Sequence, residues 1–532
     1  MAGFRRPEIP REQLVLWKHQ LDDAIPVDHP VRDFDYLLRS EAFAETFGAC
    51  ERQYVLAEGK PPYHPRDLAG LYLYGMMNGI RSSRQLEAAC WNRLDVIWLM
   101  SGQRPDHSTI APFVRRHKKT LRSVFRDVLQ VGIRAGVITL SHVSVDGTKA
   151  EADAGKGTVR SQAQIASELS RLDAAIARLE AEWSTQERRE STLFGSEVPW
   201  RPEGCGTDRQ RLARMKAKQG RLSRALASIA RRSAESVDRR GTRAICSTTD
   251  PDSRVMPDKE GKSKPNYNPQ AAVDAERGMI VASEVTDAPD DTSQLTPMVD
   301  RVAENCGQLP EEVSADSGYA TGPAIAALEQ NGVRGYLPES GQRSESPSPD
   351  TPAARAVSAT QRGETLSEAA WSALPKDGKG RITKAAFRYD GGADVYRCPM
   401  GQMLPFVRSS RDVKKWGVAI RRQYGESPAC RTCVRASMCC ANAKKGRTVN
   451  HDQYEGHRRR MRARMSSAAG RSRYRLRRET VEPRFGVIKR VLGVRRFLRR
   501  GLSEVRTEWL LACLAVNVGV LLKHWQEVRP ML

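Results

Sequence analysis

Three acidic residues, Asp146, Asp316 and Glu482, have neighbours that suit metal-assisted chemistry on phosphates. Phosphodiester transfer commonly uses two divalent ions about 4 Å apart, one beside the attacking oxygen and one beside the leaving oxygen. Hard cations such as Mg²⁺ prefer oxygen ligands, and carboxylates can hold two such ions next to a phosphate. We therefore predict that these residues form an Asp-Asp-Glu triad that binds Mg²⁺ or Mn²⁺.

Each aspartate follows a short apolar stretch and comes shortly before a glycine. Val143 and Val145 alternate before Asp146, and Val313 precedes Asp316 by three residues. Such stretches predict strands that end in turns, where a side chain projects from a rigid element. Aspartate is also common there as a plain turn residue or helix cap, so neither residue identifies a site by itself.

Glu482 is expected at or near a helix. Arg478 lies four residues before it and Lys489 seven after it, which places all three on one helical face. Pro483 follows directly, so the helix should either kink at this proline or begin with it. Glu479 is the rival ligand, but no lysine lies seven residues beyond it. We therefore assign Glu482 to the triad, with the two cations beside it to contact phosphates.

These residues belong to a longer set by which the chain resembles the DDE transposases of bacterial insertion sequences. It is most similar to the insertion sequence 1182 family, in the branch with a Tyr-Arg-Glu-Lys signature around the glutamate. The matching segments, in the family's order, are Asp146-Gly-Thr-Lys149, Thr249-Asp-Pro-Asp-Ser-Arg254, Tyr267-Asn-Pro-Gln-Ala-Ala-Val-Asp274, Ala315-Asp-Ser-Gly-Tyr319, Tyr396-Arg-Cys-Pro399 and Glu479-Thr-Val-Glu-Pro483.

The resemblance implies a DNA transposase that binds the terminal inverted repeats of its own element. It implies hydrolysis of a phosphodiester at each end, followed by attack of the freed 3′-hydroxyl on target DNA. Arg478, Lys489 and Lys149 would contact DNA. Tyr474 would join them, although it lies one residue too far from Arg478 for the family's spacing. Because two ends must be joined, a homodimer is expected in the synaptic complex.

The charge of the chain also predicts a polyanionic partner. The 87 Lys and Arg exceed the 63 Asp and Glu, which gives a formal net charge of +24. The segment from Arg458 to Arg500 alone holds 17 Lys and Arg against two Glu. Such density beside the predicted glutamate ligand favours a DNA-binding channel, with a solvated charged face as the alternative.

We expect a bacterial cytoplasmic protein, associated with the nucleoid and without a membrane segment. The first residues contain no apolar core of a secretion signal. The longest apolar run, from Trp509 to Leu522, has 14 residues and contains Asn517 and Gly519. It is shorter than the roughly 20 residues that span a bilayer. It should be a buried closing helix, and the 11 cysteines should be mostly reduced.

Residues 1–135 are predicted to form a helical N-terminal DNA-binding domain. Apolar periodicity runs through Leu68–Met77 and again through Leu86–Met100. Asp106 is a capping residue before a further helix that carries the basic run Arg115–Lys119. Short helices with a basic second helix are compatible with a helix-turn-helix unit, and equally with other all-helical domains.

The overall class is α/β, with a ribonuclease-H-like catalytic core. Its first part is expected at 136–158, and it continues over 241–338 as three strands, helix, strand, helix, strand. Between these parts, 159–240 should be an inserted antiparallel helical hairpin, with a dimerising coiled coil as the alternative. Its heptad positions are Ile165, Leu169, Leu172, Ile176, Leu179 and Trp183, answered by Leu212, Met215, Leu222, Leu226 and Ile229. The basic helical end, 456–532, would carry Glu482 to the core.

A second insertion is expected at 339–455. Its beginning, 339–385, is rich in Ser, Pro, Gly and charge, which predicts a flexible excursion. Four cysteines, Cys398, Cys430, Cys433 and Cys439, then have the spacing of a tetrahedral zinc site, with Cys440 competing for the last position. Reduced packing thiols are the alternative. Thiolates do not suit Mg²⁺, so this cluster is not the catalytic centre.

Two other functions remain open. A non-catalytic, domesticated DNA-binding protein would keep the basic segment and the cysteines, and a metal-dependent nuclease would cut DNA without joining it. A phosphate-binding loop is excluded, because the glycine that should precede Gly261-Lys-Ser263 falls on Met256. The protein should therefore not need nucleotide hydrolysis.

Overall fold

The computed structural model describes residues 21–54, 61–194, 205–235, 245–257, 261–338, 351–414, 416–425, 427–442 and 444–532. The chain divides into two units. The helical unit comprises residues up to 137 together with 491–493 and 510–532, and the sheet unit comprises 138–490 and 494–509. Helix α17 (Leu502–Lys523) begins in the sheet unit and ends in the helical unit.

The described part of the helical unit up to residue 137 is helical, as predicted. Apolar side chains repeat at helical spacing, and nearly every residue of α3 from Leu68 to Met76 is buried. Asp106 caps α6 by accepting a hydrogen bond from the Thr109 amide at 2.7 Å. The helices are α1 (Pro30–Arg39), α2 (Ala44–Glu51), α3 (Pro65–Met77), α4 (Ser83–Asn92), α5 (Leu94–Leu99), α6 (His107–Arg116) and α7 (Lys118–Arg134).

The basic run at the end of α6 does not lie on one helix, and that expectation was wrong. Helix α6 ends at Arg116 and α7 begins at Lys118, with a non-helical backbone at His117 between them. The His117 ring is buried, 2.9 Å from the Tyr54 hydroxyl and 3.3 Å from the Cys50 thiol. The buried His117 ring stabilises a break between α6 and α7, where the amino-acid sequence by itself suggests one continuous helix.

The C-terminal residues 510–532 cluster with the N-terminal helices, whereas the sequence places them with the core. The ring of Trp525 in α18 (Trp525–Val528) meets Tyr36 of α1 edge to face, and Arg529 stacks over the same tyrosine. By length and composition α17 could cross a membrane, yet most of it is buried in the protein. A buried apolar helix of this kind is typical of a protein core.

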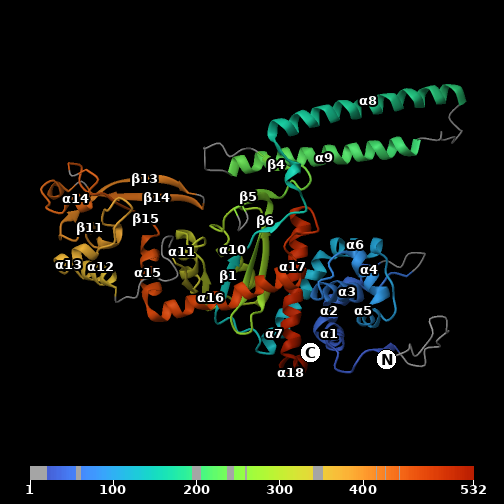
Figure 1. Ribbon diagram of the computed structural model, residues 1–532, viewed down its shortest axis with the longest axis horizontal. Helices are drawn as coiled ribbons and strands as arrows, with labels where there is room; N and C mark the ends of the chain where they lie inside the picture. Colours follow the sequence, from blue (N-terminus) through green and yellow to red (C-terminus); the bar gives the residue numbers. More distant parts are fainter. Residues whose placement is uncertain are drawn as a thin grey trace, which may run out of the picture. The chain divides into compact units, whose positions relative to one another are not determined.

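A seven-stranded mixed sheet forms the centre of the sheet unit (Figure 1). Its order is β2-β6-β1-β8-β9, and β5 and β7 also pair with the long strand β6. Strand β1 is antiparallel to β6 and parallel to β8, and β8 is parallel to β9. The strands are β1 (Val143–Gly147), β2 (Ala150–Glu151), β5 (Arg254–Pro257), β6 (Ser263–Asp274), β7 (Ile280–Thr286), β8 (Glu312–Ala315) and β9 (Arg334–Tyr336).

The order of elements along the core agrees with the prediction. The turn between β6 and β7 contains Gly278 in the left-handed region at φ 73°, a conformation that glycine adopts without strain. Helix α10 (Leu295–Cys306) then leads to β8, and α11 (Gly322–Gln330) leads to β9. A parallel strand pair needs such crossover helices, whereas an antiparallel pair needs only a short turn.

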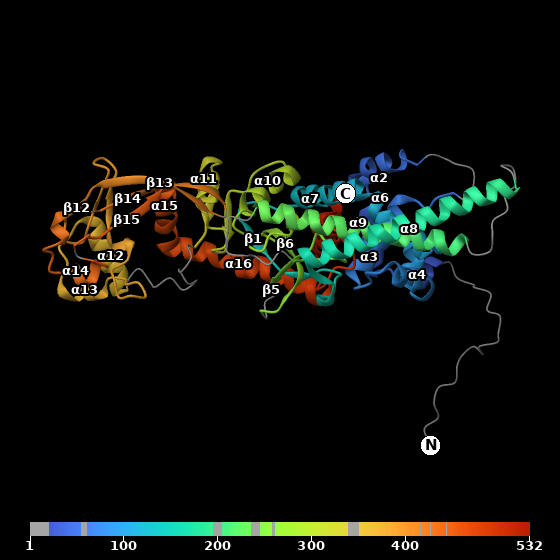
Figure 2. The same ribbon diagram turned by 90° about the horizontal axis from the view of Figure 1, so that it is seen from above.

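The predicted helical hairpin is present between β1 and β6. Helices α8 (Gln162–Phe194) and α9 (Cys205–Glu235) lie side by side in both views (Figures 1 and 2). Ile165 at the start of α8 packs with Leu222 and Ile229 toward the end of α9, so the pair is antiparallel. The short strands β3 (Val159–Ser161) and β4 (Ile245–Ser247) pair at the base of the hairpin.

The second insertion begins with ordered helices, so the expectation of a flexible excursion over 339–385 was wrong for its described part. Residues 339–350 lie outside the described residues. Helix α12 (Pro352–Arg362) is capped by Thr351 and ends at Gly363, which has φ 81°, and α13 (Glu368–Ala373) is capped by Ser367. Alanine, the strongest helix former, recurs in both helices, and these caps set their ends.

Two small antiparallel sheets follow these helices. Their strands share an apolar core that includes Trp371, Phe387, Tyr396 and Tyr424. The described strands are β10 (Arg388–Asp390), β11 (Val395–Arg397) and β12 (Met403–Leu404) in one sheet, and β13 (Phe406–Lys414), β14 (Gly417–Tyr424) and β15 (Val449–Asp452) in the other.

The chain returns to the core through α15 (Glu455–Ser466) and α16 (Ala468–Gly486). Pro483 lies inside α16, so the helix does not begin at this proline. A π-helical turn, η6 (Val487–Val491), follows directly. Proline removes one backbone donor, and such irregular turns are common beside functional sites.

Candidate active site

Asp146 and Asp316 lie side by side at one edge of the sheet. Val145 of β1 is paired with Ala315 of β8 in a parallel register, and each aspartate is the next residue of its chain. Because the strands run in the same direction, both side chains reach the same edge. The register therefore explains how two acids 170 positions apart become neighbours.

Glu482 joins them from helix α16, which packs against β1, β6 and β8. All three carboxylates contact the guanidinium of Arg477, one and a half turns before Glu482 on the same helix. Its Nη2 lies 2.9 Å from Asp146 Oδ2 and 3.8 Å from Asp316 Oδ2, while Nη1 lies 4.0 Å from Glu482 Oε1. The three predicted acids thus surround one arginine side chain that the sequence analysis had not selected.

A spacing signal for Arg477 does exist in the sequence. Two residues separate it from Tyr474, which is the distance between tyrosine and arginine in the family signature. Arg478 instead keeps the distance to Glu482 and is exposed. The two spacings point to different residues, and the helix presents only one of them to the carboxylates.

The carboxylates differ in their exposure and therefore in their electrostatics. The Asp146 side chain is 13% exposed, against 40% for Asp316 and 57% for Glu482. Burial raises the pKa of Asp146 to about 6; the Arg477 guanidinium opposes this effect and the charge of Asp316 adds to it. Burial alone would lower the pKa of Arg477, but the neighbouring acids raise it above its ordinary value. The arginine is therefore charged at every physiological pH.

Tight turns follow both aspartates. Asp146 Oδ1 accepts a hydrogen bond from the Gly147 amide at 2.9 Å, and Asp316 Oδ1 accepts one from the Gly318 amide at 2.8 Å. A Cβ atom at Gly318 would lie 3.0 Å from Asp316 Oδ1, and one at Gly147 would overlap the Gln270 amide. Glycine at these positions lets the backbone fix one oxygen of each carboxylate while the other faces Arg477.

A polar network supports the two turns from within. The buried Tyr319 hydroxyl donates to Gln270 Oε1, and Gln270 Nε2 donates to Asp291 Oδ1 at 2.8 Å. Asn268 Nδ2 donates to the same Asp291 oxygen at 2.8 Å. Trp509 of α17 donates its Nε1 proton to the Gln270 carbonyl at 3.0 Å. The sequence analysis did not assign this network, because its members are far apart along the chain and only the fold brings them together.

Two of the predicted DNA-contacting lysines lie at the turn after Asp146. Lys489 Nζ donates to the Thr148 hydroxyl and, at 3.1 Å, to the Lys149 carbonyl. Lys149 Nζ donates to the Pro289 carbonyl at 3.0 Å, and burial lowers the pKa of this lysine while nearby acids oppose the effect. Both lysines therefore tie elements of the site together.

Tyr474, the remaining predicted contact, is partly buried beside the carboxylates. Burial raises the pKa of Tyr474, the Arg477 charge opposes this, and the charges of Asp316 and Asp146 add to it. It lies on the inner side of α16, one turn before Arg477. Tyr474 and Arg477 therefore face the site together, whereas Arg478 lies on the exposed side.

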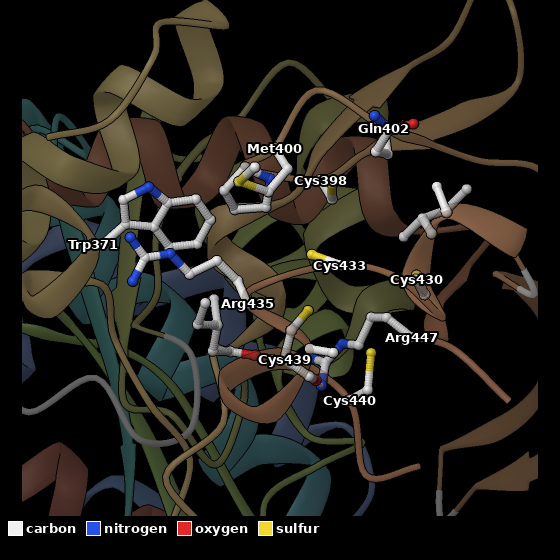
Figure 3. A pocket seen from close by; sticks show the side chains of 15 residues that line it. Trp371, Cys398, Met400, Gln402, Cys430, Cys433, Arg435, Cys439, Cys440 and Arg447 are labelled. Carbon is white, nitrogen blue, oxygen red and sulfur yellow. Dashed lines mark hydrogen bonds between the residues drawn. The ribbon is translucent and has the colours of Figure 1, made fainter. Parts of the chain in front are cut away.

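The cysteines predicted to bind zinc lie near one another in the second insertion. All five cysteines of this region line one small cavity of about 30 Å³ (Figure 3). They come from the turn after β11, from η5 (Pro428–Cys430) and the turn that follows it, and from the end of α14 (Ala436–Cys439): Cys398, Cys430, Cys433, Cys439 and Cys440. Burial raises the pKa of Cys439 to about 12, and the amides of Met400 and Gln402 donate to the Cys398 sulfur.

In the part of the chain that the structure describes, no group of three or more His, Cys, Asp or Glu side chains is arranged to hold a metal ion. At the carboxylates the Arg477 guanidinium takes up the space between the acids. The donor chemistry nevertheless fits: three carboxylates suit a hard divalent cation, and clustered thiols suit zinc.

The basic segment 458–500 is only partly free to bind an external anion. Arg458 pairs with Asp452 at 2.7 Å, and Arg462 pairs with the buried Glu455 at 2.7 Å. The first pair links α15 to the end of β15, whereas the second lies within α15. Exposed arginines of the segment are paired as well: Arg473 with Glu312, and both Arg496 and Arg500 with Asp153. Arg475, Arg478, Arg490 and Arg495 are further exposed members.

Three segments of the chain match known domain families. Residues 19–116 match the family described as Transposase domain (DUF772), and residues 240–366 and 397–522 match two families, each described as Transposase DDE domain. Asp316 and Glu482 lie within the two DDE matches, while Asp146 lies before them. No curated protein and no solved structure matches the chain significantly. The chain carries the domains of a DDE transposase, a polynucleotidyl transferase.

Proposed function

We propose that the protein is the transposase of an insertion sequence of the 1182 family, with a ribonuclease-H-like catalytic core. It binds the terminal inverted repeats of its element, hydrolyses one phosphodiester at each end and joins the freed 3′-hydroxyl to target DNA. The observation that carries this proposal is the meeting of Asp146, Asp316 and Glu482 around Arg477.

The three carboxylates are the proposed ligands of Mg²⁺ or Mn²⁺. When bound, such ions lower the pKa of water and stabilise charge on the oxygens of a phosphodiester. The chain's own residues set the geometry: the Gly147 and Gly318 amides orient Asp146 and Asp316, and α16 brings Glu482 to the same edge. No separate general base is required in this scheme.

DNA binding is proposed for both units of the chain. The helical unit would recognise the element ends, and exposed arginines of segment 458–500, Arg478 among them, would contact phosphates. Lys489, Lys149 and Tyr474 would position the DNA strand at the carboxylates. Because two ends must be processed together, we propose a homodimer in the synaptic complex, acting on DNA in the bacterial cytoplasm.

A plasmid assay tests the catalytic proposal. Supercoiled DNA carrying the sequences that flank the gene on both sides is incubated with the protein and Mg²⁺. The wild type should give nicked, linear and joined products. Glu482→Gln should reduce them more than about 100-fold, since even outer-shell partners of metal ligands are worth about 10–100-fold. Glu479→Gln, one turn earlier on α16, is the matched control and should remain close to wild type.

The same assay separates the rival functions. A wild-type protein that binds this DNA but yields no product would be a DNA-binding protein without catalysis. Nicks that are lost in Asp146→Asn, with no joined molecules, would identify a nuclease. Equal losses in Glu479→Gln and Glu482→Gln would remove the special position that we assign to Glu482.

The cysteine cavity is proposed as a structural zinc site, separate from the catalytic ions. Five thiols around one small space exceed what packing alone requires, and buried thiolates need a cation beside them. The proposed ligands are Cys398, Cys430 and Cys433 with Cys439, and Cys440 is the alternative fourth ligand.

A further inference from the structure

The guanidinium of Arg477 is the common partner of all three proposed metal ligands. Its side chain is 12% exposed and contacts acids that come from two strands and from its own helix. An arginine that braces a fold usually binds one carboxylate through a two-pronged hydrogen bond. Arg477 instead contacts three acids at once. This is the arrangement expected of a cation at the centre of an anionic site.

The geometry of the contacts supports this distinction. Only the contact with Asp146, at 2.9 Å, has the length of a hydrogen bond; those with Asp316 and Glu482, at 3.8 and 4.0 Å, do not. The Nε atom of Arg477 is buried, and no described residue provides it with a hydrogen-bond partner. Charge, more than hydrogen bonding, therefore holds the guanidinium in place.

The electrostatic need for such a cation follows from the site itself. Three carboxylates that share one small region repel each other when no cation is present, and Asp146 is largely buried. One positive charge between them reduces that repulsion. Two divalent ions in the same space would repel the guanidinium, so the arginine and the metal ions cannot both occupy the centre.

We propose that Arg477 is an internal counter-cation of the carboxylate triad, which occupies the centre of the site until divalent ions enter and is displaced by them. The proposal rests on the proposed metal-binding function of the same carboxylates. Arg477 is a positioning residue in this scheme: it keeps the three acids together without metal and competes with the ions. A purely structural arginine would do the reverse, because its loss would loosen the site and weaken metal binding.

The metal affinity of the full-length protein shows whether Arg477 weakens or strengthens metal binding. Mn²⁺ is titrated into chelator-treated, DNA-free protein, and unbound Mn²⁺ is followed by electron paramagnetic resonance. Arg477→Gln should bind Mn²⁺ about tenfold more tightly than the wild type, equivalent to about 1.4 kcal/mol. Arg471→Gln, which removes an arginine near the start of the same helix, is the control and should bind like the wild type. Equal or weaker binding by a folded Arg477→Gln would overturn the proposal.

A measurement on the unaltered protein covers the case in which Arg477→Gln does not fold. Phenylglyoxal modifies accessible arginines, and mass spectrometry locates the adducts. Adding Mn²⁺ should increase the modification of Arg477 several-fold while leaving that of Arg475 unchanged. Unchanged or reduced modification of Arg477 at saturating Mn²⁺ would show that the guanidinium stays in place.

The carboxylate variant Asp146→Asn distinguishes this proposal from the function on which it rests. If the wild type binds Mn²⁺ at a site that Asp146→Asn abolishes, the triad is a metal site, and Arg477→Gln alone decides the counter-cation role. If wild type and Asp146→Asn bind Mn²⁺ alike, the metal-binding function of the triad is itself refuted.

Discussion

Asp146 combines two properties that oppose each other in a single side chain. It must be ionised to hold a cation, yet burial raises its pKa to about 6. If Asp146 binds a metal ion as proposed, a proton and that ion would therefore compete for the same oxygens. The more exposed Asp316 and Glu482 do not have this degree of burial.

We expect metal affinity to depend on pH through Asp146. Above pH 6 the carboxylate is ionised and affinity should be nearly constant, whereas below pH 6 it should fall by about tenfold per pH unit as the proton must be displaced. Mn²⁺ titrations of the DNA-free protein between pH 5 and 8 measure this dependence. A constant affinity down to pH 5 would contradict the assignment of Asp146 as a ligand with a raised pKa.

At this scale residue type and spacing predicted much of the candidate site, but not its central cation. Neighbouring residues on a helix differ by about 100° in direction, so choosing Arg478 or Arg477 decides whether the side chain faces solvent or the acids. The distance to Glu482 favours Arg478, whereas the distance to Tyr474 favours Arg477. Gln270 lies in one of the matching segments, but no spacing in the sequence shows that it bonds to Asp291, 21 residues further along the chain.

At the scale of elements, the second insertion depends on what its cysteines bind. Its two sheets are small, and many side chains of β13 and β14 are exposed. Domains with small apolar cores are commonly stabilised by a metal or by disulfides. The described cysteines here are free thiols, so they are available as ligands for the zinc ion proposed above.

We expect the purified protein to contain about one zinc ion per chain, in keeping with a four-thiolate site. Cys433→Ser should lose it, and a strong chelator should lower the melting temperature of the wild type but not of this variant. Elemental analysis and thermal unfolding provide the measurements. Cys439→Ser and Cys440→Ser, compared under the same conditions, identify the fourth ligand as the one whose loss abolishes binding. A zinc-free wild type with five freely titrating thiols would favour packing thiols instead.

The elements that the sequence predicted well are those with strong periodicity. The heptads of 159–240 correctly predicted the hairpin of α8 and α9, and the alternating valines correctly predicted β1. An average over 339–385 misled, because within it residues 351–373 are rich in alanine and form short helices capped by Thr351 and Ser367. Caps act at single positions, so a compositional average does not register them.

At the scale of the whole molecule, the order of elements was predictable and their grouping was not. The core strands and crossover helices follow the expected sequence. The end of the chain, however, joins the N-terminal helices through α17 and α18. From Trp509 to Leu522 helix α17 is almost entirely apolar, and such a stretch has no polar face to indicate which neighbours will cover it.

The net charge of +24 leads to a prediction about DNA binding as a whole. Each phosphate contact made by an arginine releases a counterion, so the slope of log affinity against log salt concentration reports the number of contacts.

Arg475 on α16 is exposed, whereas Arg458 is paired internally with Asp452. We expect Arg475→Gln to reduce the slope by about one unit on any DNA sequence, in proportion to one lost phosphate contact. Arg458→Gln should lower thermal stability and leave the slope nearly unchanged. Fluorescence anisotropy with duplex DNA between 50 and 300 mM salt measures both, and equal slopes for Arg475→Gln and the wild type would place the DNA path elsewhere on the molecule.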